Sequence, residues 1–412
     1  MSPGIPPSPA LIALGTTAWV VAVALWFRFA RGRPAPPAVL GSLAAVGVAA
    51  LAFAYASGPR HDYLSFLMMW DGILDGKDPW DAAATGRTNA YPPLYVALAP
   101  LTLVHRLLPK LLFTAAWLAV AGWFVRLYAA RSDTRHGAAL VLGYFVLLPY
   151  FWVEVALYGH FDILPAIGTL LALHLTLQGR ELAGGVILGL ATLLKIFPLA
   201  ALPFLLVTHR RNPARLAGGC ALTIAVGALA GYALWGTSAF KPLSFAAQRE
   251  SRLLSIFQFL RGDYSPLRLV TDAPNVDWLS KILLAVAMTA LLAAAARRHM
   301  HPVVAVTSAF VVLFALYTLG NPQFQMIVFL LVPYLYVTLP ASVRLSPLLV
   351  VPVAAYLAWY SAFDVVYVVG GMLVEWPWNV LRQVVGLPTF LIAAAALAGL
   401  VSAGGARPIA AP

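Results

Sequence analysis

The chain has 412 residues, of which 61% are hydrophobic and only 10% are Asp, Glu, Lys or Arg, and its formal net charge is +12. Apolar runs recur along the whole length, so we expect an all-α, polytopic membrane protein, because a backbone in hydrocarbon must satisfy its own hydrogen bonds. The basic excess fits arginines beside anionic lipid and gives no reason to expect nucleic acid as a partner. The single cysteine, Cys220, excludes an internal disulfide.

Hydropathy predicts about thirteen spans in one integral-membrane domain covering residues 1–412. The first, residues 10–27, lacks a preceding basic region and a cleavage site, so we interpret it as a retained span. The two spans that meet at Lys195 are short, which predicts a broken or half-inserted helix there. The predicted spans lie near 10–27, 38–56, 111–128, 138–157, 162–178, 183–195, 196–208, 216–235, 279–295, 302–319, 323–340, 346–362 and 384–403.

Short arginine-rich loops fall on one side of this arrangement, which the positive-inside rule makes cytoplasmic. The long polar loops 57–110, 236–278 and 363–383 are then predicted on the other face. Within the first of them, residues 92–108 are apolar but interrupted by prolines, so we expect helix lying on the membrane surface.

The first outer loop holds five of the fifteen acids within twenty positions. Asp71, Asp75 and Asp78 follow at spacings of four and three, which predicts the water-exposed face of an interfacial helix. Its apolar residues are then expected against lipid, and Trp80 at the level of the headgroups. Those apolar residues are Phe66, Leu67, Met69, Trp70, Ile73 and Leu74.

Asp62 opens this loop, directly after the second span and next to His61. A carboxylate at a membrane–water boundary can take a proton from an incoming hydroxyl group, which is the task of a general base. Aspartate is also a favoured helix N-cap. Spacing alone leaves both interpretations open.

A second group joins Glu154 to the segment Tyr158-Gly159-His160-Phe161-Asp162 at the outer end of a span. Acids and a histidine near membrane depth need partners or a water-filled cavity. A structural metal ion is a weaker alternative, because no His-x-x-x-His pair or cysteine ligand is present. Capping of the following helix by Asp162 is the third.

Two further segments carry cations on the predicted outer face. Lys195 follows an apolar run and precedes a proline break, so it either holds a phosphate or extends to the lipid headgroups. The loop 241–268 contains Arg249 and Arg252 among aromatic residues, which suits a phosphate on a lipid tail. An interfacial helix without a ligand explains that loop equally well.

The segment Asn321-Pro322-Gln323-Phe324-Gln325 opens another span with amides and an aromatic ring. These side chains suit sugar hydroxyl groups, and they also cap helices. A phosphate-binding loop of the P-loop type, a dinucleotide fingerprint and a Gly-x-Ser-x-Gly elbow are all absent from the sequence. ATP-driven transport and soluble-type hydrolysis therefore lose support.

Taken in order, these motifs resemble the GT-C superfamily of integral-membrane glycosyltransferases, and in particular the bacterial polyprenol-phosphate-mannose-dependent α-mannosyltransferases. The resemblance covers about residues 60–340. It rests on Asp62-Tyr63, Asp78-Pro79-Trp80, Tyr91-Pro92-Pro93-Leu94, Gly159-His160-Phe161-Asp162, Ala183-Gly184-Gly185, Gly189-Leu190-Ala191 and Lys195-Ile196-Phe197-Pro198.

The resemblance implies an inverting transfer of a hexose, with mannose the first candidate, at the non-cytoplasmic face of a bacterial-type plasma membrane. The donor would be a polyprenyl-phosphate sugar and the acceptor a glycan, glycolipid or protein, with membrane lipid around the site. No metal or other cofactor is implied. In this interpretation Asp62 is the general base, and Lys195 holds the donor phosphate.

Other candidate residues complete the expected site. We expect Arg249 and Arg252 to assist Lys195 at the phosphate, and a further group to bind sugar or acceptor. That group is His61, Tyr91, His160, Asp162 and Gln323. Many superfamily members have paired acids where this chain has Arg60 and His61, so a two-acid mechanism is not expected here.

Two rival functions remain at this stage. A transporter or lipid flippase without glycosyl transfer would predict mid-membrane charges and repeated halves. A scaffold subunit of a membrane assembly would have no need of Asp62.

Overall fold

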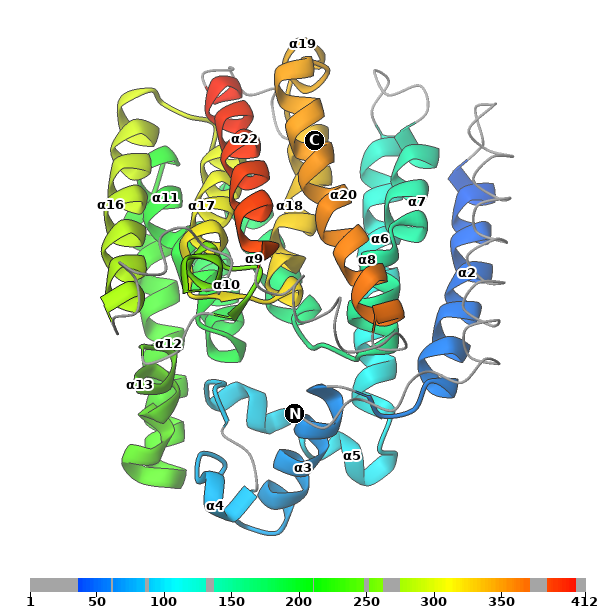
Figure 1. Ribbon diagram of the computed structural model, residues 1–412, viewed down its shortest axis with the longest axis vertical. Helices are drawn as coiled ribbons and strands as arrows, with labels where there is room; N and C mark the ends of the chain where they lie inside the picture. The colour runs from blue at the N-terminus through cyan, green and yellow to red at the C-terminus, as the bar shows by residue number, and fades with distance from the viewer. Residues whose placement is uncertain are drawn as a thin grey trace.

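The computed structural model describes residues 36–60, 62–85, 89–130, 137–209, 211–247, 252–261, 275–370 and 384–404. Within these ranges the chain is almost entirely helical (Figure 1). Six of its helices are long and apolar enough to cross a membrane, and six shorter apolar helices accompany them. The prediction of an all-α, polytopic membrane protein is confirmed. The predicted span 10–27 and the site candidates His61 and Arg249 lie outside the described residues.

The first half of the chain supplies helices that run from α2 to α11. They are α2 (Pro36–Ala56), α3 (Asp62–Leu74), α4 (Ala82–Thr85), η1 (Pro93–Leu98), α5 (Leu101–Val104), α6 (Leu108–Ala129), α7 (Gly137–Leu147), α8 (Pro149–Phe151), the π-helix η2 (Trp152–Leu157), α9 (Ile163–Leu177), α10 (Glu181–Leu194), η3 (Phe197–Ala200) and α11 (Ala201–Thr208).

The second half supplies further helices and two very short strands. They are α12 (Pro213–Trp235), η4 (Gly236–Phe240), α13 (Lys241–Ala247), β1 (Arg252–Leu253), α14 (Ile256–Arg261), α16 (Asn275–Arg297), α17 (Pro302–Leu316), β2 (Leu319–Gly320), η5 (Pro322–Gln325), α18 (Met326–Thr338), α19 (Ala341–Arg344), α20 (Pro347–Gly370) and α22 (Gly386–Ala403).

The predicted spans within the described residues coincide with these helices, with two informative differences. The span predicted at 138–157 is interrupted at Leu148 and finishes in the π-helix η2. The span predicted at 346–362 continues to Gly370, so the outer loop expected to begin at residue 363 begins later. The break predicted at Lys195 is present, because α10 ends at Leu194 and Lys195 is extended.

The first predicted outer loop forms one end of the molecule. In Figure 1, α3, α4 and α5 lie together at the end of the molecule opposite α19. Since α3 follows α2 and α5 precedes α6, this end also receives the end of α2 and the start of α6. The segments that close α10 and open α9 approach it from within the bundle.

Helix α3 was expected to place six apolar residues against lipid, but only Leu74 of the six is exposed, at 37%, and Ile73 is half-buried. Phe66, Leu67, Met69 and Trp70 are all buried within the protein. Trp80, expected at the headgroups, is also buried, and its indole Nε1 donates to the carbonyl oxygen of Tyr91 at 2.9 Å. Aromatic side chains bury a large area, so packing on neighbouring elements stabilises them more than an interface position does.

The three acids predicted on the water-exposed face of this helix reach the surface, but only Asp71 is helical, because α3 ends at Leu74 before Asp75 and Asp78. Asp71 forms an ion pair with Arg106 at 2.8 Å, and Asp75 forms one with Lys77 at 3.5 Å. Asp78 accepts a hydrogen bond from the backbone N–H of Trp80 at 2.9 Å. All three acids therefore make surface contacts.

The glycines of α10 allow close packing on its neighbours. A Cβ atom at Gly185 would lie 2.2 Å from the carbonyl oxygen of Leu216 on α12, and one at Gly189 would lie 2.7 Å from Thr223 Cβ. Small residues let helices approach in this way, and larger side chains would force them apart. The position of Lys195, directly after α10, is fixed by this packing.

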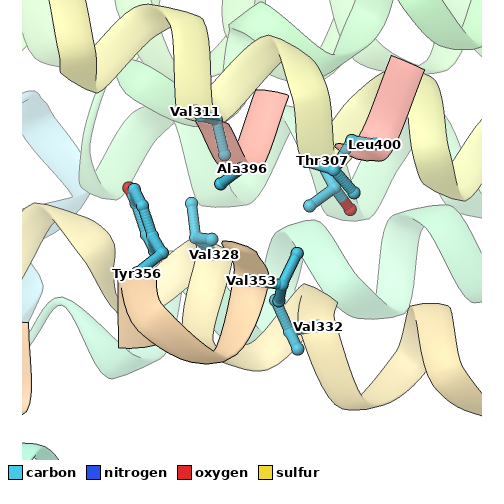
Figure 2. A pocket seen from close by; sticks show the side chains of 8 residues that line it. All are labelled: Thr307, Val311, Val328, Val332, Val353, Tyr356, Ala396 and Leu400. Carbon is cyan, nitrogen blue, oxygen red and sulfur yellow. The ribbon is translucent and has the colours of Figure 1, made fainter. Parts of the chain in front are cut away.

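A small pocket lies where α17, α18, α20 and α22 meet (Figure 2). Its lining is apolar except for the hydroxyl groups of Thr307 and Tyr356, and it includes none of the predicted site residues. We regard it as a packing gap between helices. The lining residues are Thr307, Val311, Val328, Val332, Val353, Tyr356, Ala396 and Leu400.

Candidate active site

Asp62 is the first residue of α3, and its carboxylate meets two polar side chains from distant parts of the chain. Gln323 Nε2 donates to Asp62 Oδ2 at 3.3 Å, and His160 Nε2 lies 3.4 Å from the same oxygen. The Asp62 side chain is 34% exposed. It is therefore both anchored by polar partners and open to an incoming molecule, as a general base must be.

His160 is buried and is held from its other side by Glu154. The distance between His160 Nδ1 and Glu154 Oε2 is 2.5 Å, a short contact between two side chains that are both almost fully buried. Glu154 belongs to the π-helix η2. Single π-turns are rare and are found mostly at functional sites, because they turn a side chain away from its regular helical direction.

The charge around His160 decides its protonation. Burial by itself lowers the pKa of His160, but the carboxylates of Glu154 and Asp62 outweigh it and raise that pKa to about 10. At neutral pH the imidazole is therefore protonated. An imidazolium has N–H donors on both nitrogens, so it can face Glu154 and Asp62 at once.

Gly159 turns the chain from the π-helix to His160. Its φ is +68°, a left-handed conformation that glycine adopts without strain. A Cβ atom there would lie 2.8 Å from the ring of Tyr63 and 3.0 Å from Lys110 Cγ. The tight turn also brings the His160 backbone N–H to within 2.9 Å of the Glu154 carbonyl oxygen.

Lys110 supports the same region from inside the bundle. It is fully buried, and its Nζ donates to Ser57 Oγ at 2.5 Å and to the carbonyl oxygens of Gly58 and Leu157 at 2.8 Å each. Three acceptors match the three N–H bonds of an ammonium group. This residue therefore ties the segment before Asp62 to the segment before His160. Lys110 was not among the candidate site residues in the sequence analysis.

Lys195 forms an ion pair with Asp162, and both side chains are buried. Aromatic rings surround its ammonium group, the nearest being that of Phe324 at 4.3 Å from Nζ to the ring centroid. Extension to the headgroups, one of the two alternatives for Lys195, is therefore wrong. Asp162 occupies the N-cap position of α9 but makes no side-chain capping hydrogen bond, so the capping alternative is also wrong.

The carboxylate of Asp62 and the ammonium group of Lys195 lie in the same region because each is contacted by the same two short segments. His160 contacts Asp62, and two residues later Asp162 contacts Lys195. In the other segment Gln323 contacts Asp62, and the next residue, Phe324, contacts Lys195. The structure thus brings together the carboxylate and the ammonium group that the sequence singled out.

Tyr91 completes this arrangement on the side of η1. Its ring centroid lies 4.8 Å from that of Phe161 and 5.8 Å from Lys195 Nζ. Phe66 and Tyr95 pack beneath it, at centroid distances of 5.8 and 4.6 Å. An aromatic layer of this kind excludes water from one side of the Lys195–Asp162 pair.

The basic loop 241–268 is described only in part. Arg252 lies in β1, whose pairing partner β2 leads directly to Asn321 and Gln323. Gly320 permits this pairing, because a Cβ atom there would lie 2.3 Å from the backbone nitrogen of Ser255. The backbone of Arg252 is thus near the segment that holds Asp62, whereas a phosphate-binding role for Arg249 and Arg252 stays a prediction.

One polar residue of this region was assigned to the wrong place by the sequence. Asp364 was expected in an outer loop, but it lies within α20, a helix that packs against η2, and is 1% exposed. The signal was present, because Val365, Val366 and Val368 continue the apolar run beyond it. An acid inside such a run indicates a buried partner.

Among the described residues, no three His, Cys, Asp or Glu side chains are arranged to hold a metal ion. The prediction that the reaction uses no cofactor is not tested by this observation. The polar groups instead form one chain of acid and histidine contacts beside one ion pair.

A family model described as glycosyltransferase family 87 matches residues 89–322, which is more than half of the chain. The chain belongs to glycosyltransferase family 87. The matched segment contains Glu154, His160, Asp162 and Lys195, and it stops one residue before Gln323. Comparisons with curated proteins and with solved structures found no match.

Membership of family 87 makes this protein a membrane glycosyltransferase, which acts on a sugar donor and an acceptor among membrane lipids. It supports the resemblance to the GT-C superfamily. It also argues against the transporter, flippase and scaffold interpretations. Two of the contacting residues, Asp62 and Gln323, lie outside the matched segment on either side.

Proposed function

We propose that this family 87 glycosyltransferase moves a hexose, mannose being the first candidate, from a polyprenyl-phosphate donor to a hydroxyl group of a glycan, lipid or protein. The observation that carries the proposal is the placement of Asp62 and Lys195 at one end of the helical bundle, each held by the same two segments. Glycosyl transfer needs a base that deprotonates the acceptor hydroxyl group and a cation that stabilises the leaving phosphate, and these two residues can supply both.

The reaction proceeds as a single displacement at the anomeric carbon. Asp62 takes the proton of the acceptor hydroxyl group, whose oxygen forms the new bond to that carbon. The bond from carbon to phosphate oxygen breaks, and the polyprenyl phosphate leaves with the electron pair. Attack opposite the leaving group inverts the anomeric configuration.

Lys195 stabilises the charge that develops on the departing phosphate. The ammonium group has three N–H bonds, so it can keep its contact with Asp162 while another N–H meets a phosphate oxygen. Its surroundings are aromatic and poor in water, and charge interactions are stronger in such an environment.

The substrates enter from different environments. The polyprenyl tail stays in lipid, so its phosphate approaches the interface between the helices, and the acceptor arrives from water at the exposed carboxylate of Asp62. The arrangement of basic loops in the sequence supports the proposal that this end is on the non-cytoplasmic face. Holding both reactants in one geometry supplies a large part of the rate acceleration.

The test is transfer of radiolabelled mannose from polyprenyl-phosphate-mannose by the protein in liposomes that contain an envelope lipid and glycan extract. Wild type is expected to transfer label, and Asp62→Asn to transfer almost none. Asp71→Asn is the matched control, because Asp71 lies on the same helix and pairs with Arg106 on the surface.

Two outcomes would contradict parts of the proposal. Equal transfer by wild type and Asp62→Asn would remove Asp62 as the base. Label transferred from the glucose, galactose or arabinofuranose donor, but not from the mannose donor, would correct the sugar while keeping the mechanism.

A further inference from the structure

Helix η5, which carries Gln323 and Phe324, is a single 3-10 turn of four residues between β2 and α18. Its side chains reach both halves of the site, because Gln323 contacts Asp62 and Phe324 contacts Lys195. A 3-10 turn has poor hydrogen-bond geometry, and so short a helix has little stability of its own. The direction of these two side chains therefore depends on the contacts that hold the turn at its ends.

The first residue of η5 is held by Tyr150 of α8. Tyr150 Oη donates to the carbonyl oxygen of Pro322 at 2.8 Å, and the tyrosine side chain is fully buried. Its ring stacks on that of Phe329 in α18, with the ring centroids 3.8 Å apart and an angle of 13° between the planes. This stacking fixes the ring, so the hydroxyl group has a defined direction toward η5.

The last residue of η5, Gln325, is held by two tyrosines of α20. Gln325 Oε1 accepts a hydrogen bond from the hydroxyl group of Tyr356, and Gln325 Nε2 donates to Tyr360 Oη at 3.1 Å. All three side chains are 1% exposed. A primary amide has both donors and an acceptor, so it can bridge two hydroxyl groups that lie one helical turn apart. Leucine at this position would leave both hydroxyl groups buried without that partner.

We propose that Tyr150 and Gln325 are positioning residues for glycosyl transfer, which fix η5 at its two ends and thereby direct its side chains at the general base and at the phosphate-binding cation. This inference rests on the proposed roles of Asp62 and Lys195. Both positioning residues are buried, so they act through η5 and not by touching a substrate. Because η5 serves both halves of the site, displacing it should lower kcat and raise the donor KM together.

The first experiment compares two tyrosines that make the same hydrogen bond at different places. Tyr128 of α6 is also buried, and its Oη donates to the carbonyl oxygen of Pro333 within α18 at 2.8 Å, as that of Tyr150 does to Pro322. Phenylalanine removes only the hydroxyl group in each case. In proteoliposomes, Tyr150→Phe is expected to lower kcat by about tenfold and to raise the donor KM, because a small misplacement of the reacting groups is costly. Tyr128→Phe, the matched control, should keep both constants of wild type.

A second set of variants separates position from stability. Gln325→Leu should lower both the unfolding temperature and the rate of transfer, since it leaves two buried hydroxyl groups without their partner. The triple variant Gln325→Leu/Tyr356→Phe/Tyr360→Phe removes those hydroxyl groups, so its unfolding temperature should return toward that of wild type. Its rate of transfer should stay low, because the end of η5 is still not anchored.

Two results of these kinetic experiments would overturn the proposal. One is recovery of transfer together with stability in the triple variant, which would mean that Gln325 serves folding alone. The other is an equal change of kcat and donor KM in Tyr150→Phe and Tyr128→Phe, since only the first hydroxyl group holds η5.

A further measurement needs no substrate and so stands apart from the proposed function. Backbone hydrogen exchange in the peptide that contains η5, followed by mass spectrometry of the resting protein, is expected to be faster in Tyr150→Phe than in wild type or Tyr128→Phe. Unchanged exchange in both Tyr150→Phe and Gln325→Leu would show that these residues do not anchor η5. Inactivity of wild type with every sugar donor, with the difference in exchange present, would contradict the proposed function alone.

Discussion

Asp62 and Lys195 contact neighbouring residues of the same two segments. His160 and Gln323 meet the carboxylate, whereas Asp162 and Phe324 meet the ammonium group. Neither segment is close to Asp62 in the sequence. A base and a phosphate-binding cation are therefore fixed relative to each other by two loops, and disturbing one loop should disturb both groups.

Replacing Asp62 by asparagine should remove proton abstraction while preserving shape. We expect kcat to fall by about 10²- to 10⁴-fold with little change in the donor KM, since general base catalysis contributes on that scale. The measurement is the initial rate of label transfer at several donor concentrations. Asp71→Asn should keep the wild-type rate, and a comparable loss in that control would show that the loop, not the base, is responsible.

Lys195→Met should destabilise the protein, because it leaves the carboxylate of Asp162 buried without its partner. Breaking a buried ion pair costs about 3–5 kcal/mol. The double variant Lys195→Met/Asp162→Asn removes both charges, so thermal unfolding should return toward wild type.

The same double variant tests the phosphate-binding role of Lys195. With folding restored, sugar transfer should stay low, because no cation remains for the donor phosphate. Recovery of both stability and transfer in the double variant would mean that Lys195 serves only to neutralise Asp162.

Gly159→Ala should be more harmful than the same change at another glycine with positive φ. Gly76 also has a positive φ, at +77°, but a Cβ atom there meets nothing within 4 Å, whereas one at Gly159 meets Tyr63 and Lys110. The left-handed conformation alone costs about 1–2 kcal/mol for alanine. The clash at Gly159 should add about 1–3 kcal/mol.

The measurement for this pair is thermal unfolding together with transfer rate. Gly159→Ala should also lose activity, because it displaces His160 from Asp62. Equal unfolding temperatures for the two variants would contradict the close packing described around Gly159.

The stability of the protein should depend on pH through His160. The pKa of this residue rises from 6.5 to about 10 on folding. Burial disfavours the protonated imidazole, but the negative charges of Glu154 and Asp62 outweigh that effect. The carboxyl group of Asp162 also interacts with the charge of His160. A raised pKa stabilises the folded state fully below pH 6.5, and this contribution is lost as the pH rises toward 10.

This dependence can be measured as the difference in unfolding temperature between wild type and His160→Gln from pH 6 to pH 10. The difference should shrink steadily as the pH rises, while groups elsewhere affect both proteins alike. A difference that is constant across this range would contradict a protonated His160 in the folded protein.

Several features of the site could be predicted from residue types alone. Asp62, His160, Asp162, Lys195 and Gln323 were singled out because polar side chains are rare in this chain, and Tyr91 because of the resemblance to the GT-C superfamily; each of them lies in the contacts described above. The helices were equally predictable, since an apolar run of sufficient length must be helical in lipid. The break at Lys195 followed from the proline after it.

Which polar side chains pair with each other, by contrast, depends on which helices pack together. From the sequence, contact with a lipid headgroup was an alternative for Lys195, and capping of a helix was an alternative for Asp162. The two residues instead form an ion pair, because the glycines of α10 allow close packing that places the end of α10 beside α9. The sequence also predicted that the apolar face of α3 contacts lipid, although the aromatic residues of that helix are buried within the protein.

Hydropathy and the scarcity of polar groups act locally, so the order of amino acids was enough to predict a helical membrane protein and the short set of residues able to carry charge chemistry. The pairing of those residues depends on how the helices pack. Lys195 shows the reason: a buried ammonium group needs an anion beside it, and Asp162 supplies that anion only because α10 packs against α9.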